Sequence, residues 1–198
     1  MNEPARVACF RTDRIGDLIL AMPAMAALAR ALPGGRIVPV VAPRTADLVT
    51  AQAWAEEAVR WTPAEGAGAL ARSLRERRID GAVFFYPRPA AALGAALAGV
   101  RTRVGPASRW YAPLFTHRVR MHRSENRRHE LLYNFDLLAP FGVAAPNDPE
   151  LIAPIIPAPA EEEARAVLRG EEIGERYVVI HPGSGGSALN AGPERYGE

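Results

Sequence analysis

Residues 6–17 read RVACFRTDRIGD, an apolar run that passes through a polar turn. The apolar run predicts a strand over 6–10, and the Ala- and Leu-rich stretch after the turn predicts a helix over 17–31. Short apolar runs then alternate with helical runs along the first two thirds of the chain. This alternation is typical of a parallel sheet covered by helices on both faces, so we expect an α/β fold.

The middle of the chain continues this pattern less regularly. We expect further strands at 36–42, 58–61 and 81–86, and helices at 44–53, 68–78 and 90–97. Residues 101–105 indicate a short edge strand, whereas residues 109–121 mix aromatic residues with arginine and give no clear pattern. After Ser124, a plausible N-cap, one helical face carries Leu131, Leu132, Phe135 and Leu138.

A proline-rich segment divides the chain. Residues 153–160 read APIIPAPA, which is typical of an extended linker between a first domain over 1–152 and a second segment over 161–198. In that second segment we expect a helix over 161–169, a buried strand over 177–181, a Gly/Ser loop over 182–190 and another helix from Pro193, as a second α/β domain would begin.

Composition and charge exclude several classes of protein. Of 198 residues 48% are hydrophobic and 23% charged, which suits a folded core. The 24 basic and 22 acidic residues give a net charge of +2, too balanced for a protein that mainly binds nucleic acid. Every basic residue is Arg, so no lysine can form a Schiff base or act as a general base.

The same features indicate a cytoplasmic protein. Cys9 is the single cysteine and lies in an apolar run, so we expect a small buried side chain in a reducing compartment. The N-terminus lacks a secretory pattern, and the longest apolar stretches are about a dozen residues, short of the ~20 that a membrane span needs. No spacing of His, Cys, Asp or Glu indicates a metal site.

The first candidate site is Arg11–Asp17, directly after the first expected strand. Open parallel sheets bind ligands beyond the carboxyl ends of their strands, so polar side chains here point toward a cleft. Gly16 would let the backbone turn closely, and free N–H groups at the helix start would hold Asp17 ionised. The alternative, that Asp17 only caps the helix, is about equally well supported. With Gly16 as the single glycine, the motif is not a dinucleotide fingerprint, which disfavours an oxidoreductase.

The second candidate site is HPGSGGS at 181–187, again between an expected strand and a helix. Its glycines expose backbone N–H groups and its serines add hydroxyl donors, which suits the oxygens of a diphosphate. The donors would come from Gly183, Ser184, Gly185, Gly186 and Ser187. The loop lacks the Lys-Ser/Thr ending of a P-loop, which disfavours an ATPase or GTPase; the alternative is a plain connecting loop.

These stretches together resemble a known family. RTDRIGDLILAMPA, then YVVIHPGSGG and PERY, resemble the family 9 glycosyltransferases, which include the lipopolysaccharide heptosyltransferases, and HRSENRRHELLYNFDLLAPFG is similar to the end of their acceptor domain. The resemblance implies a GT-B-like architecture: one complete Rossmann-like, acceptor-binding domain over 1–152 and the beginning of a nucleotide-sugar domain over 161–198. It implies inverting transfer of a heptose or related sugar from a nucleotide sugar such as ADP-heptose to a lipopolysaccharide-core or similar glycan, with no metal or cofactor.

The resemblance also implies roles for the candidate residues. Asp17 matches the catalytic aspartate that takes the acceptor proton, and the loop at 183–187 would meet the donor diphosphate. An anionic acceptor would suit bidentate guanidinium groups, and the candidates are Arg11, Arg14, Arg118, Arg120 and Arg123. The alternative for these arginines is a solvated basic face. Such a face could also hold the enzyme peripherally against an anionic inner membrane.

The sequence departs from the family pattern after the second motif. Leu189, Ala191 and Gly192 stand where relatives carry a basic residue and Trp-Pro, so an expected diphosphate contact and a packing aromatic are missing. Residues 161–198 are also too few for a nucleoside pocket. The alternative function is therefore a non-catalytic module that binds anionic glycolipid, or an inactive fragment.

Overall fold

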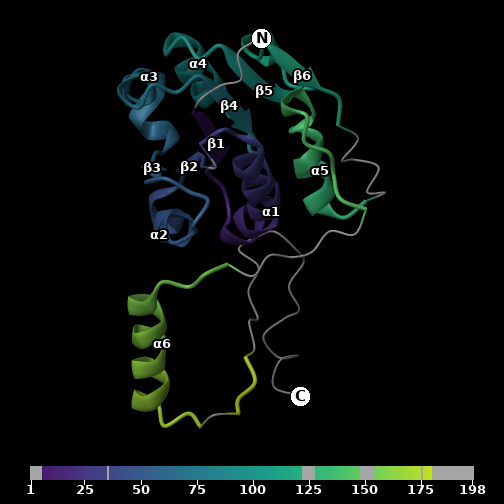
Figure 1. The fold of residues 1–198 in the computed structure, drawn as a ribbon. Helices are drawn as coiled ribbons and strands as arrows, with labels where there is room; N and C mark the ends of the chain where they lie inside the picture. Colours follow the sequence, from purple (N-terminus) through teal and green to yellow (C-terminus); the bar gives the residue numbers. More distant parts are fainter. Residues whose placement is uncertain (1–5, 35, 122–127, 148–153, 175, 180–198) are drawn as a thin grey trace, which may run out of the picture. The chain divides into compact units, whose positions relative to one another are not determined.

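The structure is a computed structural model that describes residues 6–34, 36–121, 128–147, 154–174 and 176–179 (Figure 1). Its strands are β1 (Val7–Arg11), β2 (Val38–Val41), β3 (Val59–Arg60), β4 (Gly81–Phe84), β5 (Thr102–Pro106) and β6 (His117–Val119). Its α-helices are α1 (Ile15–Ala31), α2 (Ala46–Thr50), α3 (Gly66–Glu76), α4 (Pro89–Leu97), α5 (Glu130–Asp136) and α6 (Ala158–Gly170). Short 3₁₀ turns are η1 (Pro43–Thr45), η2 (Pro63–Glu65), η3 (Ala112–Leu114) and η5 (Ala139–Phe141).

The six strands form one parallel sheet in the order β3-β2-β1-β4-β5-β6. β1 lies in the centre, paired with β2 on one side and β4 on the other, so the strand order reverses beside it. All carboxyl ends of the strands share one edge, and the reversal at β1 and β4 is the point where such sheets bind ligands. The α/β fold expected from the sequence is confirmed.

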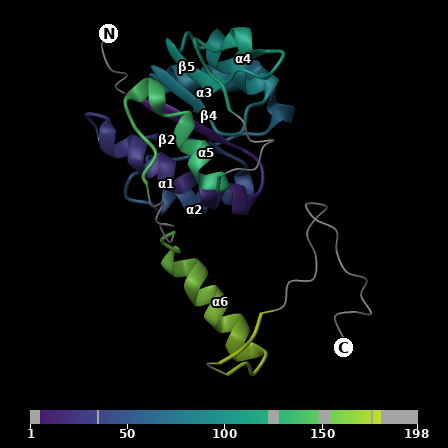
Figure 2. The same ribbon diagram turned by 90° about the vertical axis from the view of Figure 1, so that its right-hand side faces the viewer.

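Alternating side chains of the strands build two apolar cores. Val7 and Cys9 of β1 face the core that α1, α2 and α5 cover, whereas Ala8 and Phe10 face the core under α3 and α4. This follows from the period of two along a strand. The two sets of helices lie on opposite faces of the sheet (Figure 2). Cys9 is fully buried, and burial raises the pKa of its thiol, as expected for a small structural side chain.

α5 is fixed to α1 by a buried amide. Asn134 is fully buried, and its Nδ2 donates a hydrogen bond to the carbonyl oxygen of Leu20 at 3.0 Å. The helix begins at Glu130 and is capped by His129, whose Nδ1 accepts from the backbone N–H of Leu131, whereas the expected cap Ser124 lies outside the described residues. Of the predicted apolar face, Leu131 and Phe135 of α5 are buried, as is Leu138 just after the helix, whereas Leu132 is only half-buried against the same core.

Two details of the sheet differ from the prediction. The expected edge strand at 101–105 is β5, which lies inside the sheet because β6 pairs with it on the outer side. β6 comes from the stretch 109–121, where alternation could not be read because arginine occupies every second position near its end. The sheet is therefore one strand wider than the sequence pattern indicated.

The second part of the chain also departs from prediction. α6 begins at Ala158 rather than Glu161, because Pro159 is tolerated in the first turn of a helix, so the expected linker 153–160 overlaps it. Residues 177–179 form no strand, and Val178 and Val179 are 87% and 77% exposed, so a buried strand there is wrong for the described residues. Within the described residues no strand pairs with this segment, so the hydrogen bonds that a strand needs are not formed. The expected loop and the helix from Pro193 lie outside the described residues.

The chain divides into two units, residues 1–157 and 158–198. The first contains the whole sheet and both cores, and the second contains α6, none of whose residues is buried. No helix in the described part of the chain has both the length and the apolar character needed to cross a bilayer. Everything that positions the first candidate site therefore lies in the first unit.

Candidate active site

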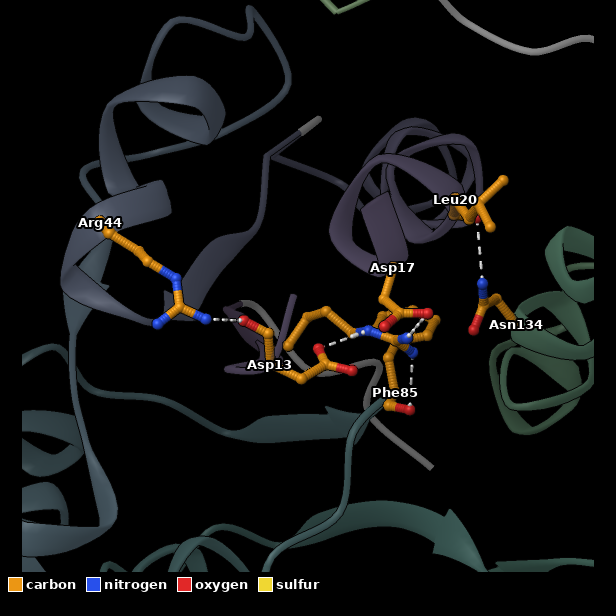
Figure 3. Close-up of polar contacts among 7 residues, drawn as sticks. Asp13, Asp17, Leu20, Arg44, Phe85 and Asn134 are labelled. Carbon is orange, nitrogen blue, oxygen red and sulfur yellow. Dashed lines mark hydrogen bonds and ion pairs between the residues drawn. The ribbon is translucent and has the colours of Figure 1, made fainter. Parts of the chain in front are cut away.

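The first motif lies at the carboxyl end of the central strand. Arg11 is the last residue of β1, Asp13 follows in the turn, and Asp17 lies in the first turn of α1 (Figure 3). The short turn of three residues between strand and helix brings these three side chains together. The structure therefore places two carboxylates and a guanidinium where an open parallel sheet binds its ligand.

Arg11 holds the two carboxylates from a buried position. Its side chain is 3% exposed; Nε lies 2.8 Å from Oδ1 of Asp13, and Nη2 lies 3.1 Å from Oδ1 of Asp17. Nη1 donates a hydrogen bond to the carbonyl oxygen of Phe85 at 3.1 Å. Each guanidinium nitrogen thus faces a protein oxygen, and a direct contact with an acceptor phosphate would require one of these pairs to break.

Asp13 lies on the inner side of the pair of carboxylates. Its side chain is 12% exposed, and although its Oδ1 lies close to Nε of Arg11, the direction of the N–H bond falls short of a hydrogen bond. Burial raises the pKa of Asp13; the charge of Arg11 lowers it, and the charge of Asp17 raises it further. Burial has the largest effect, because the charge of Arg11 is shared between two carboxylates. The backbone oxygen of Asp13 accepts a hydrogen bond from Arg44 at 2.9 Å.

Asp17 lies on the outer side of the pair. Its side chain is 37% exposed, and its Oδ1 pairs with Arg11. The N-cap of α1 is Arg14, three residues earlier, so the alternative that Asp17 only caps this helix is wrong. A carboxylate in the first turn is stabilised by the free N–H groups and the helix dipole. Asp17 therefore combines a position fixed by Arg11 with access to solvent, as a proton acceptor requires.

Gly16 is not needed for the backbone turn that the sequence suggested. Its φ lies outside the left-handed region, and a Cβ built on it would meet no atom within 4 Å. Another residue would satisfy the helix backbone equally well at this position. The glycine instead leaves open space in the same turn as Asp17, where a ligand can approach the backbone closely.

The structure does not bring the other predicted arginines together at this cluster. Arg14 is exposed at the start of α1, close in sequence to Asp17. Arg118 and Arg120 are exposed on and just after β6, three strands from β1, which corresponds to about 14 Å between backbones. The remaining predicted contacts lie outside the described residues: Arg123, the donor-loop residues Gly183, Ser184, Gly185, Gly186 and Ser187, and the departures Leu189, Ala191 and Gly192.

Sequence reasoning missed a second polar group at the end of β4. The ring of Tyr86 lies 4.6 Å from the guanidinium of Arg88 and 6.0 Å from that of Arg11. Beside it, a pocket of about 270 Å³ is lined by Phe84, Phe85, Pro87, Pro106, Ser108, Arg109, Met121 and Leu137. Phe85 connects this pocket to Arg11 through its carbonyl oxygen. The signal was available, because Tyr86 is the last residue of the strand that the sequence predicts at 81–86, and Arg88 follows two residues later.

The described residues contain no group of three or more His, Cys, Asp or Glu side chains close enough to hold a metal ion. A half-exposed carboxylate held by a buried guanidinium can accept a proton, and the pocket beside it offers a hydroxyl and a guanidinium to a polar ligand.

Comparison with known proteins gives the class to which this fold corresponds. No protein-family model matches the chain. A curated protein of Haemophilus influenzae named "Putative glycosyltransferase" is 26% identical over 205 residues, which cover 98% of this chain and 58% of that protein. The chain thus spans little more than half the length of this relative.

Solved structures of family 9 glycosyltransferases share the fold. One from Veillonella parvula matches 86% of this chain with a TM-score of 0.71 and 16% identity. The ADP-heptose lipopolysaccharide heptosyltransferase II of E. coli matches 86% with a TM-score of 0.65 and 19% identity. E. coli heptosyltransferase WaaC with ADP-2-deoxy-2-fluoro heptose matches 73% with a TM-score of 0.57 and 18% identity. The chain covers about half of each of these structures.

The chain therefore has the α/β, GT-B-like fold of glycosyltransferases. More narrowly, the resemblance to family 9 that the sequence motifs indicate is confirmed by the match to structures of that family, and the curated relative is named "Putative glycosyltransferase". The candidate site in the first unit therefore lies within a fold that is shared with glycosyltransferases.

Proposed function

We propose that this chain carries the acceptor-binding part of a family 9 glycosyltransferase and that Asp17 is its general base. The observation that carries the proposal is the Asp17 carboxylate, which is 37% exposed and paired with buried Arg11 at the carboxyl edge of the central strand. The match to glycosyltransferase structures supports the reaction class. Within this proposal residues 1–152 bind the acceptor and residues 161–198 begin the donor domain.

The proposed reaction inverts the configuration of the transferred sugar. An acceptor hydroxyl attacks the anomeric carbon of a nucleotide sugar from the face opposite the diphosphate, the bond from that carbon to the diphosphate oxygen breaks, and Asp17 takes the hydroxyl proton. Arg11 fixes the position of Asp17 and keeps its charge compensated before the proton arrives. The diphosphate leaves with the electrons of the broken bond, and backbone N–H groups of Gly183–Ser187 are proposed to stabilise its charge.

Substrates are proposed from the chemistry of the site and from the relatives. Matched heptosyltransferase structures contain ADP and an ADP-heptose analogue, which supports ADP-heptose as the donor here. Exposed Arg14, together with Ser108 and Arg109 of the pocket beside Phe85, suits an anionic acceptor such as a phosphorylated lipopolysaccharide core. Arg118, Arg120 and Arg123 are proposed as more distant contacts of the same acceptor. We place the reaction in the cytoplasm, as the composition predicts.

Replacing Asp17 by Asn tests the base directly, in the protein that carries this chain. The amide keeps the size of the side chain but cannot take the proton, so kcat should fall by about 10²- to 10⁴-fold while KM for the acceptor changes little. Initial rates of transfer from ADP-heptose to a heptose-accepting lipopolysaccharide core would measure this. The matched control is Asp47→Asn, an exposed carboxylate on α2 that pairs with Arg60. Equal rates for the two variants would remove Asp17 from the mechanism.

A non-catalytic module that binds anionic glycolipid is the second candidate, and the exposed Arg14 and Arg109 favour it. Titration calorimetry separates the two functions, because an enzyme must bind nucleotide sugar as well as acceptor. Heat of binding with ADP-heptose supports the enzyme. Heat with the glycolipid alone supports the module.

A further inference from the structure

An apolar groove opens on the face of the first unit opposite α1. It has a volume of about 440 Å³ and is lined by Pro89, Ala90, Leu93, Trp110, Tyr111, Pro113 and Leu114. Trp110 is 83% exposed, and Leu93 and Leu97, one turn apart on α4, are 42% and 51% exposed. Large apolar side chains rarely form an exposed cluster on a soluble protein, and where they do, the cluster often marks an interaction surface.

The groove rests on a rigid aromatic base. The hydroxyl of Tyr111 donates a hydrogen bond to the carbonyl oxygen of Pro87 at 2.9 Å. The ring of Tyr111 packs edge-on against Trp110 and Phe115, with ring centroids 5.3 and 6.0 Å apart. Phe115 in turn contacts Phe84 of the sheet at 5.1 Å. Trp110 therefore keeps its exposed position because it packs on Tyr111, which packs in turn on buried Phe115.

The rim of the groove is positively charged. Residues 81–121 contain six arginines and no aspartate or glutamate, and the arginines are Arg88, Arg101, Arg103, Arg109, Arg118 and Arg120. Arg88 precedes α4 and Arg109 precedes Trp110, and both are exposed. Arg88 and Arg109 are the chain neighbours of Pro89 and Trp110, which line the groove. Burial raises the pKa of the Tyr111 hydroxyl, and the charges of Arg109 and Arg88 lower it.

We propose that this surface, formed by the apolar groove and Arg88 and Arg109 and here called the α4 face, binds an anionic lipid bilayer. Trp and Leu side chains suit the boundary between headgroups and acyl chains, and guanidinium groups pair with lipid phosphates. A second copy of the chain fits less well, because joining two α4 faces would bring arginines against arginines. None of these residues belongs to the Asp17 cluster, and Arg109 also lines the pocket that is proposed to receive the acceptor.

Vesicle binding tests the proposal. The protein should sediment with vesicles of phosphatidylcholine and phosphatidylglycerol, bind vesicles of phosphatidylcholine alone much less, and lose binding as salt rises. Tryptophan emission reports the site, because Trp61 is 2% exposed and Trp54 half-buried, so a blue shift on binding must come mainly from Trp110. Binding without a blue shift would contradict the α4 face as the docking surface.

Variants give the matched comparison. Trp110→Ser and Leu93→Ser should each weaken the partition coefficient about tenfold, and Arg88→Ser or Arg109→Ser about fivefold. Arg30→Ser, at the end of α1 on the other side of the sheet, and Val167→Ser, exposed on α6, should leave binding unchanged. Asp17→Asn should also bind vesicles normally, so a failed base and a failed membrane surface are distinguishable. Equal binding by the Trp110→Ser and Val167→Ser variants would overturn the proposal, as would self-association through Trp110 without vesicle binding.

Discussion

Arg11 joins two carboxylates and a backbone carbonyl from one buried position. A buried guanidinium is costly to desolvate, and the two aspartates offset that cost only together. Asp13 and Asp17 therefore have different roles, although both pair with Arg11. Asp13 is nearly buried and compensates the charge of Arg11, whereas Asp17 is exposed enough to meet a ligand.

Replacing Arg11 by Met should therefore destabilise the protein and not only its site. The change leaves two close carboxylates without their cation, at a cost of about 3 kcal/mol, the lower end for a broken buried pair because Asp17 is partly solvated. Arg14→Met, three residues later and exposed, is the control and should change stability by less than about 0.5 kcal/mol. Urea unfolding followed by circular dichroism measures both. Similar midpoints for the two variants would contradict the structural role of Arg11.

The sequence identified Asp17 but not the position of its partner. Asp17 was found because residues that follow a strand of a parallel sheet lie at the ligand-binding edge. Arg11 was predicted to contact the acceptor because its guanidinium suits an anionic ligand and it lies close to Asp17 in the sequence. Its burial depends on Phe85, 74 residues away along the chain, and no local pattern contains such a contact.

At the scale of elements, β5 and the segment before β6 fit closely because β5 carries a glycine. A Cβ at Gly105 would lie 2.4 Å from the ring of Phe115, which packs on Phe84 and Tyr111. Gly105 thus allows the aromatic base of the groove to lie directly on the sheet. The packing at this edge of the sheet and the position of the α4 face therefore both depend on the close contact between Gly105 and Phe115.

Gly105→Ala should therefore lower the free energy of unfolding by about 1–3 kcal/mol, since the ring of Phe115 must move. The control is Gly68→Ala in α3, where a Cβ meets nothing within 4 Å and helix propensity predicts a gain of about 0.5–1 kcal/mol. Denaturant titration of both variants would give opposite signs. A stabilised Gly105→Ala variant would show that Phe115 is not held as described.

The sequence predicted strands well where short apolar runs alternate with helical runs. It predicted them poorly where tertiary contacts decide whether a segment forms a strand. Every position of β1, β2 and β4 is buried, and apart from Arg11 at the end of β1 none of these residues is polar, so the sequence signals the strands strongly. The single apolar residue of β6, Val119, lies between Arg118 and Arg120, so the sequence shows no apolar run. Only its pairing with β5 makes this segment a strand. Residues 177–179 have the composition of a strand but no described neighbour to pair with.

At the scale of the whole molecule, one unit carries the sheet, both cores and the Asp17 cluster. Even the last residues of this unit are tied to it, since Gln52 exchanges hydrogen bonds with the backbone of Ile155 at 3.0 and 3.2 Å. The second unit contributes a helix with no buried residue. Cooperative unfolding should therefore be a property of residues 1–157 alone.

A chain that ends after Pro157 should accordingly unfold in one cooperative transition with a midpoint close to that of the 198-residue chain. The reason is that all buried apolar side chains of the described residues lie before this point. Thermal melts followed by far-ultraviolet circular dichroism would compare the two chains. A broad transition, or a midpoint lowered by many degrees, would show that residues 158–198 stabilise the first unit.

The burial of Cys9 has a practical consequence for studying this protein. The thiol lies inside β1 with no exposed area and a raised pKa, so a maleimide dye has no reactive thiolate to attack in the folded chain. A cysteine introduced at an exposed position such as Ser108 would then be the sole labelling site, with no need to remove a native one. Fluorophores attached in this way could follow ligand arrival in single molecules of otherwise unaltered sequence.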